Sequence, residues 1–364
     1  MIHTFESMLA NLTDPRIERC KLHTLEDIIA LTIIAVICGA ESWESIEDFG
    51  RSKRKFLKTI LQLPNGIPSH DTIERLFKRL DSTQFEKCFI AWTNQLRNKT
   101  DGQLISIDGK SVNGSQDVIN GKFAVHMVSA WCAENQIVLG QVKTHSKINE
   151  IEAIKQLLDL LDLEGCVITI DAMGCQKDIA KRIVEKKAEY ILAVKDNQST
   201  LKEEISSLFN CIKPQTIDEQ VEKNHGRIET RKCEVINHLD LLDCKVEWMG
   251  LKSIIKISAE RNIKNKITSE QRYYISSEEN TAVHFNDKVR AHWGVENSLH
   301  WILDVQFNED LSRKRKDNAA ENFTIIRRIA LNKLKNHKYK RFGVNNKRLK
   351  AAWDNEFLLE VLKN

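Results

Sequence analysis

Two short apolar segments of this chain each run into an aspartate, and this pattern restricts the fold more than any other feature. Residues 103–107 (QLISI) precede Asp108, and residues 166–170 (CVITI) precede Asp171. Both segments are rich in β-branched residues, as short buried strands are, so each acid is expected where a strand ends. Two strand ends therefore carry carboxylates.

A third acid, Glu296, lies within a helical pattern. Asn286 or Asp287 can cap a helix that continues to Leu303. At about 100° per residue, four side chains fall within roughly 60° of Glu296 on the helix surface: Val289, Trp293, His300 and Leu303. This stripe is largely apolar, and a carboxylate that faces a core is costly unless a cation or hydrogen-bond donors meet it. A metal ion shared with Asp108 and Asp171 would supply that cation.

The composition is that of a globular protein with two or three compact regions. The chain has 364 residues, of which 41% are hydrophobic and 29% charged. Its longest apolar stretch, 28–40, is shorter than the roughly 20 residues that span a bilayer, and no basic leader opens the sequence. The nine cysteines contain no C-x-x-C pair, which favours reduced thiols in a cytosol over disulfides or zinc. We expect a cytoplasmic protein without a membrane partner.

Basic residues gather towards the C-terminal end. Residues 311–350 contain 14 Lys and Arg and two acids, a local net charge of +12, whereas the whole chain carries +4. Such a segment is either a solvated basic helix or a polyanion-binding surface. Beside three acids of the kind used in phosphoryl transfer, nucleic acid is the favoured partner.

The N-terminal part, residues 1–97, has helical periodicity. A turn at 65–69 (NGIPS) precedes an amphipathic segment at 70–80, which leaves Arg75, Lys78 and Arg79 on its outer face. A helix, a turn and a helix with exposed bases fit a helix-turn-helix that reads DNA. A helical packing domain fits the same pattern equally well.

From residue 102 the hydrophobic period changes to that of strands. Helical patterns at 149–162 and 176–187 separate the later strands, and Glu134–Asn135 can turn a hairpin. The order β-β-β-α-β-α-β predicts a mixed sheet with helices on its faces. The five strands are expected at 104–107, 123–131, 137–143, 167–170 and 190–194.

Residues 200–285 fit a β-rich insertion before the Glu296 helix. Strands are expected at 225–235, 253–258 and 271–276. In the first of them Arg227, Glu229 and Arg231 would share one face, either as a solvated edge or as a DNA contact.

Taken together, these residues resemble the DDE transposases of bacterial insertion sequences, in particular the family of H-repeat-associated proteins. The resemblance covers essentially the whole chain, from DPR at 14–16 to RRIALN at 327–332. Each matching string is short, but their order and spacing are specific. The sharpest are IDGKS at 107–111, IDAMGCQ at 170–176, AVKDNQ at 193–198 and HWGVENSLHW at 292–301.

This resemblance implies an α/β fold: an RNase H-like mixed sheet with flanking helices, an N-terminal helical domain and a β-rich insertion before the last catalytic helix. It implies that Asp108, Asp171 and Glu296 are the catalytic and metal-binding triad. The expected parts are an N-terminal helical domain at 1–97, the first part of the catalytic core at 98–200, the insertion at 201–285, and the second part of the core with the basic tail at 286–364.

Three carboxylates suit Mg²⁺ or Mn²⁺, which prefer oxygen ligands. Two such ions can activate water or a 3′-hydroxyl on one side of a phosphodiester and stabilise the leaving oxygen on the other. The expected function is therefore a transposase that cleaves the ends of its insertion sequence and joins them to target DNA. The alternatives are an RNase H-like structure-specific nuclease and a domesticated, non-catalytic DNA-binding protein.

The expected partners follow from that function. They are the terminal inverted repeats of the element, target DNA and a second copy of the chain, because two ends must be cleaved in register. The expected location is the bacterial cytoplasm, at the nucleoid.

Further side chains are candidates for DNA contact. Lys110 and Lys195 follow strands at the expected active edge, where cations can meet phosphates, and the amides of Asn197 and Gln198 stand beside Lys195. The other candidates are His292, Arg227, Arg231, Arg313 and Arg315.

Several residues near Glu296 have competing interpretations. His292 and His300 flank it by one turn, but Mg²⁺ avoids imidazole, so packing or phosphate contact is expected for them rather than metal ligation. Trp293 and Trp301 fit core packing better than stacking on an unpaired base. Three nearby acids are rivals of Glu296 for the third ligand position, and Glu296 is preferred: Asp304, Glu309 and Asp310.

Overall fold

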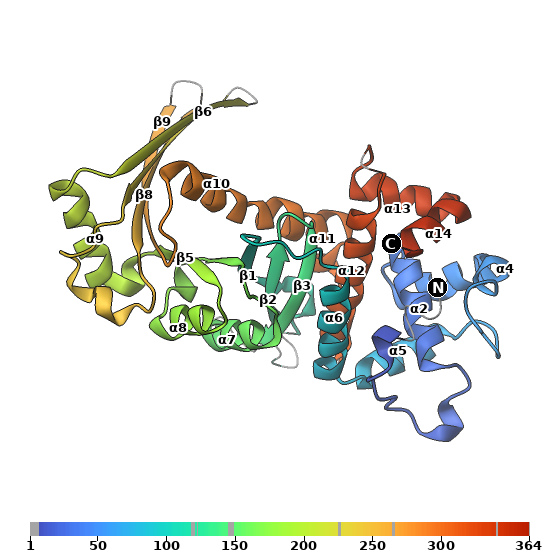
Figure 1. The fold of residues 1–364 in the computed structure, drawn as a ribbon. Coiled ribbons are helices and arrows are strands. Elements are labelled where there is room, and N and C mark those ends of the chain that lie inside the picture. The colour runs from blue at the N-terminus through green and yellow to red at the C-terminus, as the bar shows by residue number, and fades with distance from the viewer. Residues whose placement is uncertain are drawn as a thin grey trace.

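A nine-stranded mixed sheet runs through the molecule (Figure 1). The computed structural model describes residues 7–117, 121, 123–144, 149–224, 227–263, 266–339 and 341–363. In these residues the strand order is β3-β2-β1-β4-β5-β9-β8-β7-β6, and every helix is too short or too polar to span a membrane. The strands are β1 (Leu104–Val112), β2 (Val125–Cys132), β3 (Ile137–Thr144), β4 (Val167–Ile170), β5 (Glu189–Val194), β6 (Thr216–Asn224), β7 (Arg227–Ile236), β8 (Ser253–Ile263) and β9 (Lys266–Ser276).

The first five strands form the mixed core that the sequence predicts. Strands β1, β2 and β3 are antiparallel neighbours, whereas β4 and β5 run parallel to β1. Helices α7 (Glu150–Leu160) and α8 (Lys177–Glu185) pack on one face of this part of the sheet, and α10 (Ala282–His292) packs on the other (Figure 1). The predicted α/β fold with flanking helices is confirmed.

The β-rich insertion is also confirmed, and it extends the core sheet. Strand β9 pairs antiparallel with β5, and β8, β7 and β6 follow outwards, so the inserted strands lengthen the same sheet (Figure 1). Strand β6 and the preceding helix α9 (Ser199–Cys211) are absent from the sequence prediction. In β6 the apolar residues Ile217 and Val221 are both more than half exposed, so the strand lacks the buried apolar face by which strands are recognised.

The predicted helix from residue 286 to 303 is wrong in its start and its continuity. The cap of α10 is Thr281, five residues before the expected cap Asn286, and its side chain accepts a hydrogen bond from the backbone N–H of His284. Asn286 lies inside the helix and donates to Asp218 Oδ2 at 2.7 Å. After α10 the chain forms a π-helical turn at Glu296–His300 and then α11 (Trp301–Gln306).

The π-helical turn changes which side chains face the core. Its i→i+5 hydrogen bonds widen the turn, so a count of 100° per residue no longer holds across it. The Glu296 side chain is 56% exposed, and it does not lie on a buried stripe as predicted. Trp293 and Trp301 are also exposed, at 45% and 51%, which makes the expectation of core packing for both tryptophans wrong.

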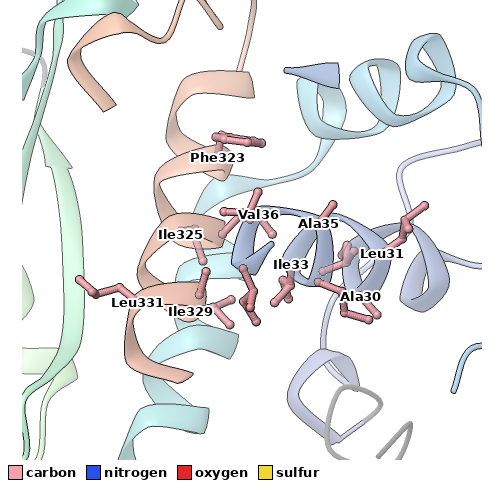
Figure 2. Packing of buried hydrophobic residues seen from close by; sticks show 14 of the residues in the cluster. Ala30, Leu31, Ile33, Ala35, Val36, Phe323, Ile325, Ile329 and Leu331 are labelled. Carbon is pink, nitrogen blue, oxygen red and sulfur yellow. The ribbon is translucent and has the colours of Figure 1, made fainter. Parts of the chain in front are cut away.

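The N-terminal helices share one hydrophobic core with the helices that follow the sheet. After its first turn helix α2 is almost wholly apolar, as expected for a helix buried on all sides, and Figure 2 shows its Val36 and Ile33 on the side towards Ile325 and Ile329 of α12. The division of the chain at residues 97, 200 and 285 stays a prediction. The helices concerned are α2 (Leu25–Ile37), α3 (Trp43–Ser52), α4 (Arg54–Leu57), α5 (His70–Arg79), α6 (Ser82–Leu96), α12 (Ala319–Asn336), α13 (Val344–Trp353) and α14 (Asn355–Lys363).

The basic segment 311–350 is not a continuous polyanion-binding surface. Five of its basic side chains are buried, because α12 is a central helix and α13 packs against it. The buried cations have internal partners: Arg348 Nη2 lies 2.6 Å from Glu41 Oε1, and Lys347 Nζ donates to the Leu334 carbonyl at 2.7 Å. The five are Arg327, Arg328, Lys333, Lys347 and Arg348.

Candidate active site

The register of two parallel strands brings the first two acids to one edge of the sheet. Ile107 of β1 pairs with Ile170 of β4, so Asp108 and Asp171 each follow the last paired residue of this ladder. The Asp171 carboxylate caps the short 3₁₀ turn 172–174, accepting the backbone N–H of Met173 at 3.0 Å. Asp171 follows the end of β4, as predicted, but the expected strand end at Asp108 is wrong: β1 continues to Val112, and Asp108 pairs with Ser129 of β2.

Helix α10 brings the third acid to the same edge. His292, near its end, has Nδ1 2.9 Å from Thr169 Oγ1 on β4, and this contact fastens the helix beside the sheet. The following π-helical turn points Glu296 towards Asp108. The ligating atoms of Asp108, Glu296 and His300 all lie within 4.8 Å of one another. Asp171 is not part of this close group, but it lines the same cavity of about 350 Å³ as Asp108 and Glu296.

The surroundings of each acid shift its pKa. Burial, helped by the nearby Glu296 and Asp171 charges, raises the pKa of Asp108 to about 6. Burial and then the Glu150 carboxylate raise the pKa of Asp171. The half-exposed Glu296 behaves differently, because a long hydrogen bond with His300 lowers its pKa. The raised pKa values of Asp108 and Asp171 mean that their charged forms are unfavourable without a counterion, which is typical of a cation-binding site. Their oxygen donors suit a hard divalent ion.

The three rival acids are already paired with two cations inside the protein. Lys110 Nζ lies 2.7 Å from Asp304 Oδ1 and 2.9 Å from Asp310 Oδ1. Glu309 Oε1 lies 2.9 Å from Arg328 Nη1, and both side chains are completely buried. Because these carboxylates are already paired with Lys110 and Arg328, Glu296 is better placed than any of them to meet an added metal ion.

The predicted DNA-contacting lysines differ in their surroundings. Lys195 is exposed and lines the cavity of the three acids. The Lys110 side chain is only 9% exposed and is held by the two aspartates, so a phosphate contact would require these ion pairs to break. The exposed Arg313 lies away from the triad, in a cavity lined by α3 and the segment before α12.

The remaining DNA-contact candidates mostly bond within the protein. Asn197 Nδ2 donates to the Ala172 carbonyl at 2.7 Å, and Gln198 Nε2 donates to the Cys175 carbonyl at 2.9 Å, so both amides hold the turn after Asp171. His292 is bound to β4 as described. Arg315 Nε donates to the Gly114 carbonyl at 3.0 Å.

Of the two candidate arginines of β7, Arg231 lines a groove that Glu296 also lines. Arg231 Nη2 contacts Glu229 Oε1 at 3.2 Å in this groove, between the inserted strands and α10. The side chain of Arg227 lies outside the part of the chain that the structure describes. Roles of all these residues in DNA binding stay predictions.

Two features of the site have no counterpart in the sequence prediction. His126 on β2 links Ser111 of β1 to Glu150 of α7, with Nδ1 3.0 Å from Ser111 Oγ and Nε2 3.2 Å from Glu150 Oε2. A Cβ on Gly109, the residue after Asp108, would lie 2.4 Å from Glu150 Oε1. A glycine directly after the acid, inside β1, was the available signal that another side chain packs on this backbone.

The third unforeseen element is a cation–π pair at the mouth of the cavity. The Arg272 guanidinium of β9 stacks 4.6 Å from the centre of the exposed Trp293 ring. No sequence spacing connects these residues, because they meet only when the inserted strands extend the core sheet beside α10.

Comparison with known proteins gives consistent matches. The family model "Transposase DDE domain" matches residues 99–333, and the model "DDE_Tnp_1-associated" matches residues 6–93. The chain is 47% identical to "Putative transposase YncI" of Escherichia coli O157:H7, over 93% of this chain and 89% of that protein. It is 44% identical to "H repeat-associated putative transposase YhhI" of Escherichia coli (strain K12), over 93% of this chain and 92% of that protein.

Among solved structures, one match is a piggyBac transposase synaptic complex with hairpin DNA. It has a TM-score of 0.45 and 12% sequence identity, and it covers 99% of this chain and 77% of that one.

Proposed function

Because the chain belongs to the transposase DDE domain family, we propose that Asp108, Asp171 and Glu296 are its catalytic acids and metal ligands. The chain is a transposase, an enzyme that cleaves DNA and transfers strands. One observation carries the residue assignment: acids far apart in the sequence line one cavity, while the rival acids nearby are already paired with Lys110 and Arg328.

The proposed cofactor is a pair of Mg²⁺ or Mn²⁺ ions. Asp108 is central among the acids, so it is proposed to be shared, with Glu296 on one side and Asp171 on the other. When bound, the ions would activate the attacking oxygen of water or a 3′-hydroxyl and stabilise the leaving oxygen of the phosphodiester. The fit rests on the donor set, three carboxylates in one cavity.

The protein's own side chains would position the DNA. The exposed Lys195, on the rim of the cavity, can pair with a phosphate that flanks the scissile bond. Asn197 and Gln198 hold the turn that carries Asp171, which fixes the direction of its carboxylate. His292 fastens α10 to β4, which fixes the approach of Glu296.

The proposed substrates are the terminal inverted repeats of the element and then target DNA. The same acids would serve both hydrolysis at the element's end and joining of the new 3′-hydroxyl to the target. A dimer on DNA, in the bacterial cytoplasm at the nucleoid, is part of this proposal.

The test uses purified full-length protein, duplexes that carry the element's ends, and Mg²⁺ or Mn²⁺. Asp108→Asn, Asp171→Asn and Glu296→Gln are each expected to lower cleavage and strand transfer by more than about 100-fold, since even outer partners of metal ligands cost 10- to 100-fold. DNA binding, measured by gel shift, is expected to survive. The matched control is Asp196→Asn, an exposed acid on the same cavity whose partner is Lys202.

Two results would contradict the assignment. One is full activity in any of the three triad variants, and the other is an equal loss in Asp196→Asn. Cleavage without joined products in the wild type would favour the structure-specific nuclease instead.

A further inference from the structure

His300 is a buried imidazole between two of the proposed metal ligands. Its side chain is 6% exposed, and its Nδ1 lies 3.4 Å from Glu296 Oε2 and 3.5 Å from Asp108 Oδ2. The other ring nitrogen, Nε2, is buried and has no hydrogen-bond partner among the described residues. The polar contacts of the ring are therefore those with the two acids.

These distances are long for hydrogen bonds. An N–H···O bond usually measures about 2.7–3.2 Å, and one N–H cannot point well at two separate oxygens. A hydrogen-bonding role alone therefore explains the position of the ring poorly.

The same distances fit three ligands of one ion. Ligands that are each about 2.1 Å from a metal lie about 3.0 Å apart at a right angle and about 3.4 Å apart at a tetrahedral angle. The two separations from Nδ1, 3.4 and 3.5 Å, are of this size, and all three ligating atoms lie within 4.8 Å of one another, so rotation of the two carboxylate side chains could bring them to one ion. The π-helical turn supplies this placement, since Glu296 and His300 are its first and last residues.

We propose that His300 Nδ1 binds a divalent ion together with Asp108 and Glu296, in a site with one nitrogen donor and two carboxylate donors. This inference rests on the proposed function of the acids and reverses the expectation that His300 does not ligate. Imidazole suits transition metals, whereas Mg²⁺ takes oxygen ligands, so the site should prefer Mn²⁺. Asp171, which lies outside the close group, would share the second position with Asp108.

The decisive measurement is pulsed EPR of Mn²⁺ bound to the full-length protein, with Mn²⁺ alone as the probe. A bound imidazole nitrogen gives a ¹⁴N modulation that carboxylates and water do not give. Wild-type protein is expected to show this modulation, and growth with ¹⁵N-histidine is expected to change it. Because that comparison needs no substitution, it does not depend on whether a variant folds.

Variants then identify the histidine that supplies the nitrogen and measure how much it contributes to Mn²⁺ affinity. His300→Gln is expected to lose the ¹⁴N modulation and at least about tenfold in Mn²⁺ affinity, with a smaller loss for Mg²⁺. The matched control is His284→Gln, which replaces a histidine of α10 that pairs with Glu278 outside the cavity of the acids, and it is expected to keep the modulation.

The outcomes separate this inference from the proposed function. Mn²⁺ that binds without a ¹⁴N signal, and whose binding is lost in Asp108→Asn, overturns the role of His300 and leaves the triad standing. Mn²⁺ binding that is unaffected by Asp108→Asn, or no Mn²⁺ binding by the wild type, overturns both.

Discussion

Replacement of Gly109 by alanine should destabilise the protein through a single steric conflict. The added Cβ would lie 2.4 Å from Glu150 Oε1 and 2.6 Å from His126 Nε2, and both neighbours are more than 90% buried. Neither can move aside without disturbing the 3.2 Å contact between them. Overpacking of this kind costs about 1–3 kcal/mol, and loss of a buried hydrogen bond adds about 1 kcal/mol. We therefore expect Gly109→Ala to lower the unfolding free energy by about 2–4 kcal/mol.

The assay is chemical denaturation followed by fluorescence and circular dichroism. Gly294→Ala is the matched control, because a Cβ at that position, close to Glu296, meets nothing within 4 Å. Removing the obstructing carboxylate with Glu150→Ala should reduce the cost of Gly109→Ala, so the double variant should show a coupling between the two sites. If Gly109→Ala is as stable as Gly294→Ala, then Glu150 does not pack tightly against the backbone of Gly109, and the predicted steric conflict is refuted.

Two further predictions concern buried and exposed charges. Burial raises the pKa of Glu86 to about 8 from 4.5, so its neutral form stabilises the folded protein at low pH and this contribution is lost as pH rises towards 8. As the pH rises from 4.5 to about 8, the Glu86→Gln variant should lose less stability than the wild type, and the difference should be on the order of 5 kcal/mol at most. Denaturation at several pH values measures this difference. Parallel curves of stability against pH for the two proteins would refute the prediction. Lys110→Met should lower stability by about 1–3 kcal/mol, because Asp304 and Asp310 lose their cation. Lys195 is exposed, so Lys195→Met should change stability by no more than about 0.5 kcal/mol and reduce the salt dependence of DNA binding by about one unit of slope. A stability loss in Lys195→Met and none in Lys110→Met would contradict the surroundings described for the two lysines.

The core of the fold could be predicted because its signals are local. Strand β4 has the expected bounds, 167–170. A short run of β-branched residues between a helix and an acid strongly favours a buried strand over other secondary structures. The helices at 149–162 and 176–187 were recognisable from their apolar faces. Strand β6 was not, because its apolar side chains face solvent and its pairing with β7 leaves no sequence period.

The site was predictable in its acids and less so in its surroundings. Asp171 follows a strand, as the sequence shows directly, whereas Asp108 lies inside β1, which pairs with β2 as far as Val112. The orientation of Glu296 could not be derived, because a π-helical turn depends on backbone hydrogen bonds that no residue spacing reveals. For the same reason the sequence favoured packing or phosphate contact for His300, which lies between two acids.

The pairing of Lys110 with Asp304 and Asp310 was equally hidden. These residues are about 200 positions apart in the chain, and the sequence shows only a lysine after a strand and acids after a helix. A surface lysine and a buried ion-pairing lysine look alike in sequence until their neighbours are known.

The most direct test of the three-acid centre is the anomalous diffraction of crystals soaked in Mn²⁺. The expected result is manganese within about 2.2 Å of carboxylate oxygens of Asp108, shared with Glu296 on one side and Asp171 on the other. Manganese bound at Asp304 and Asp310 instead, or absent from Asp108, would contradict the account.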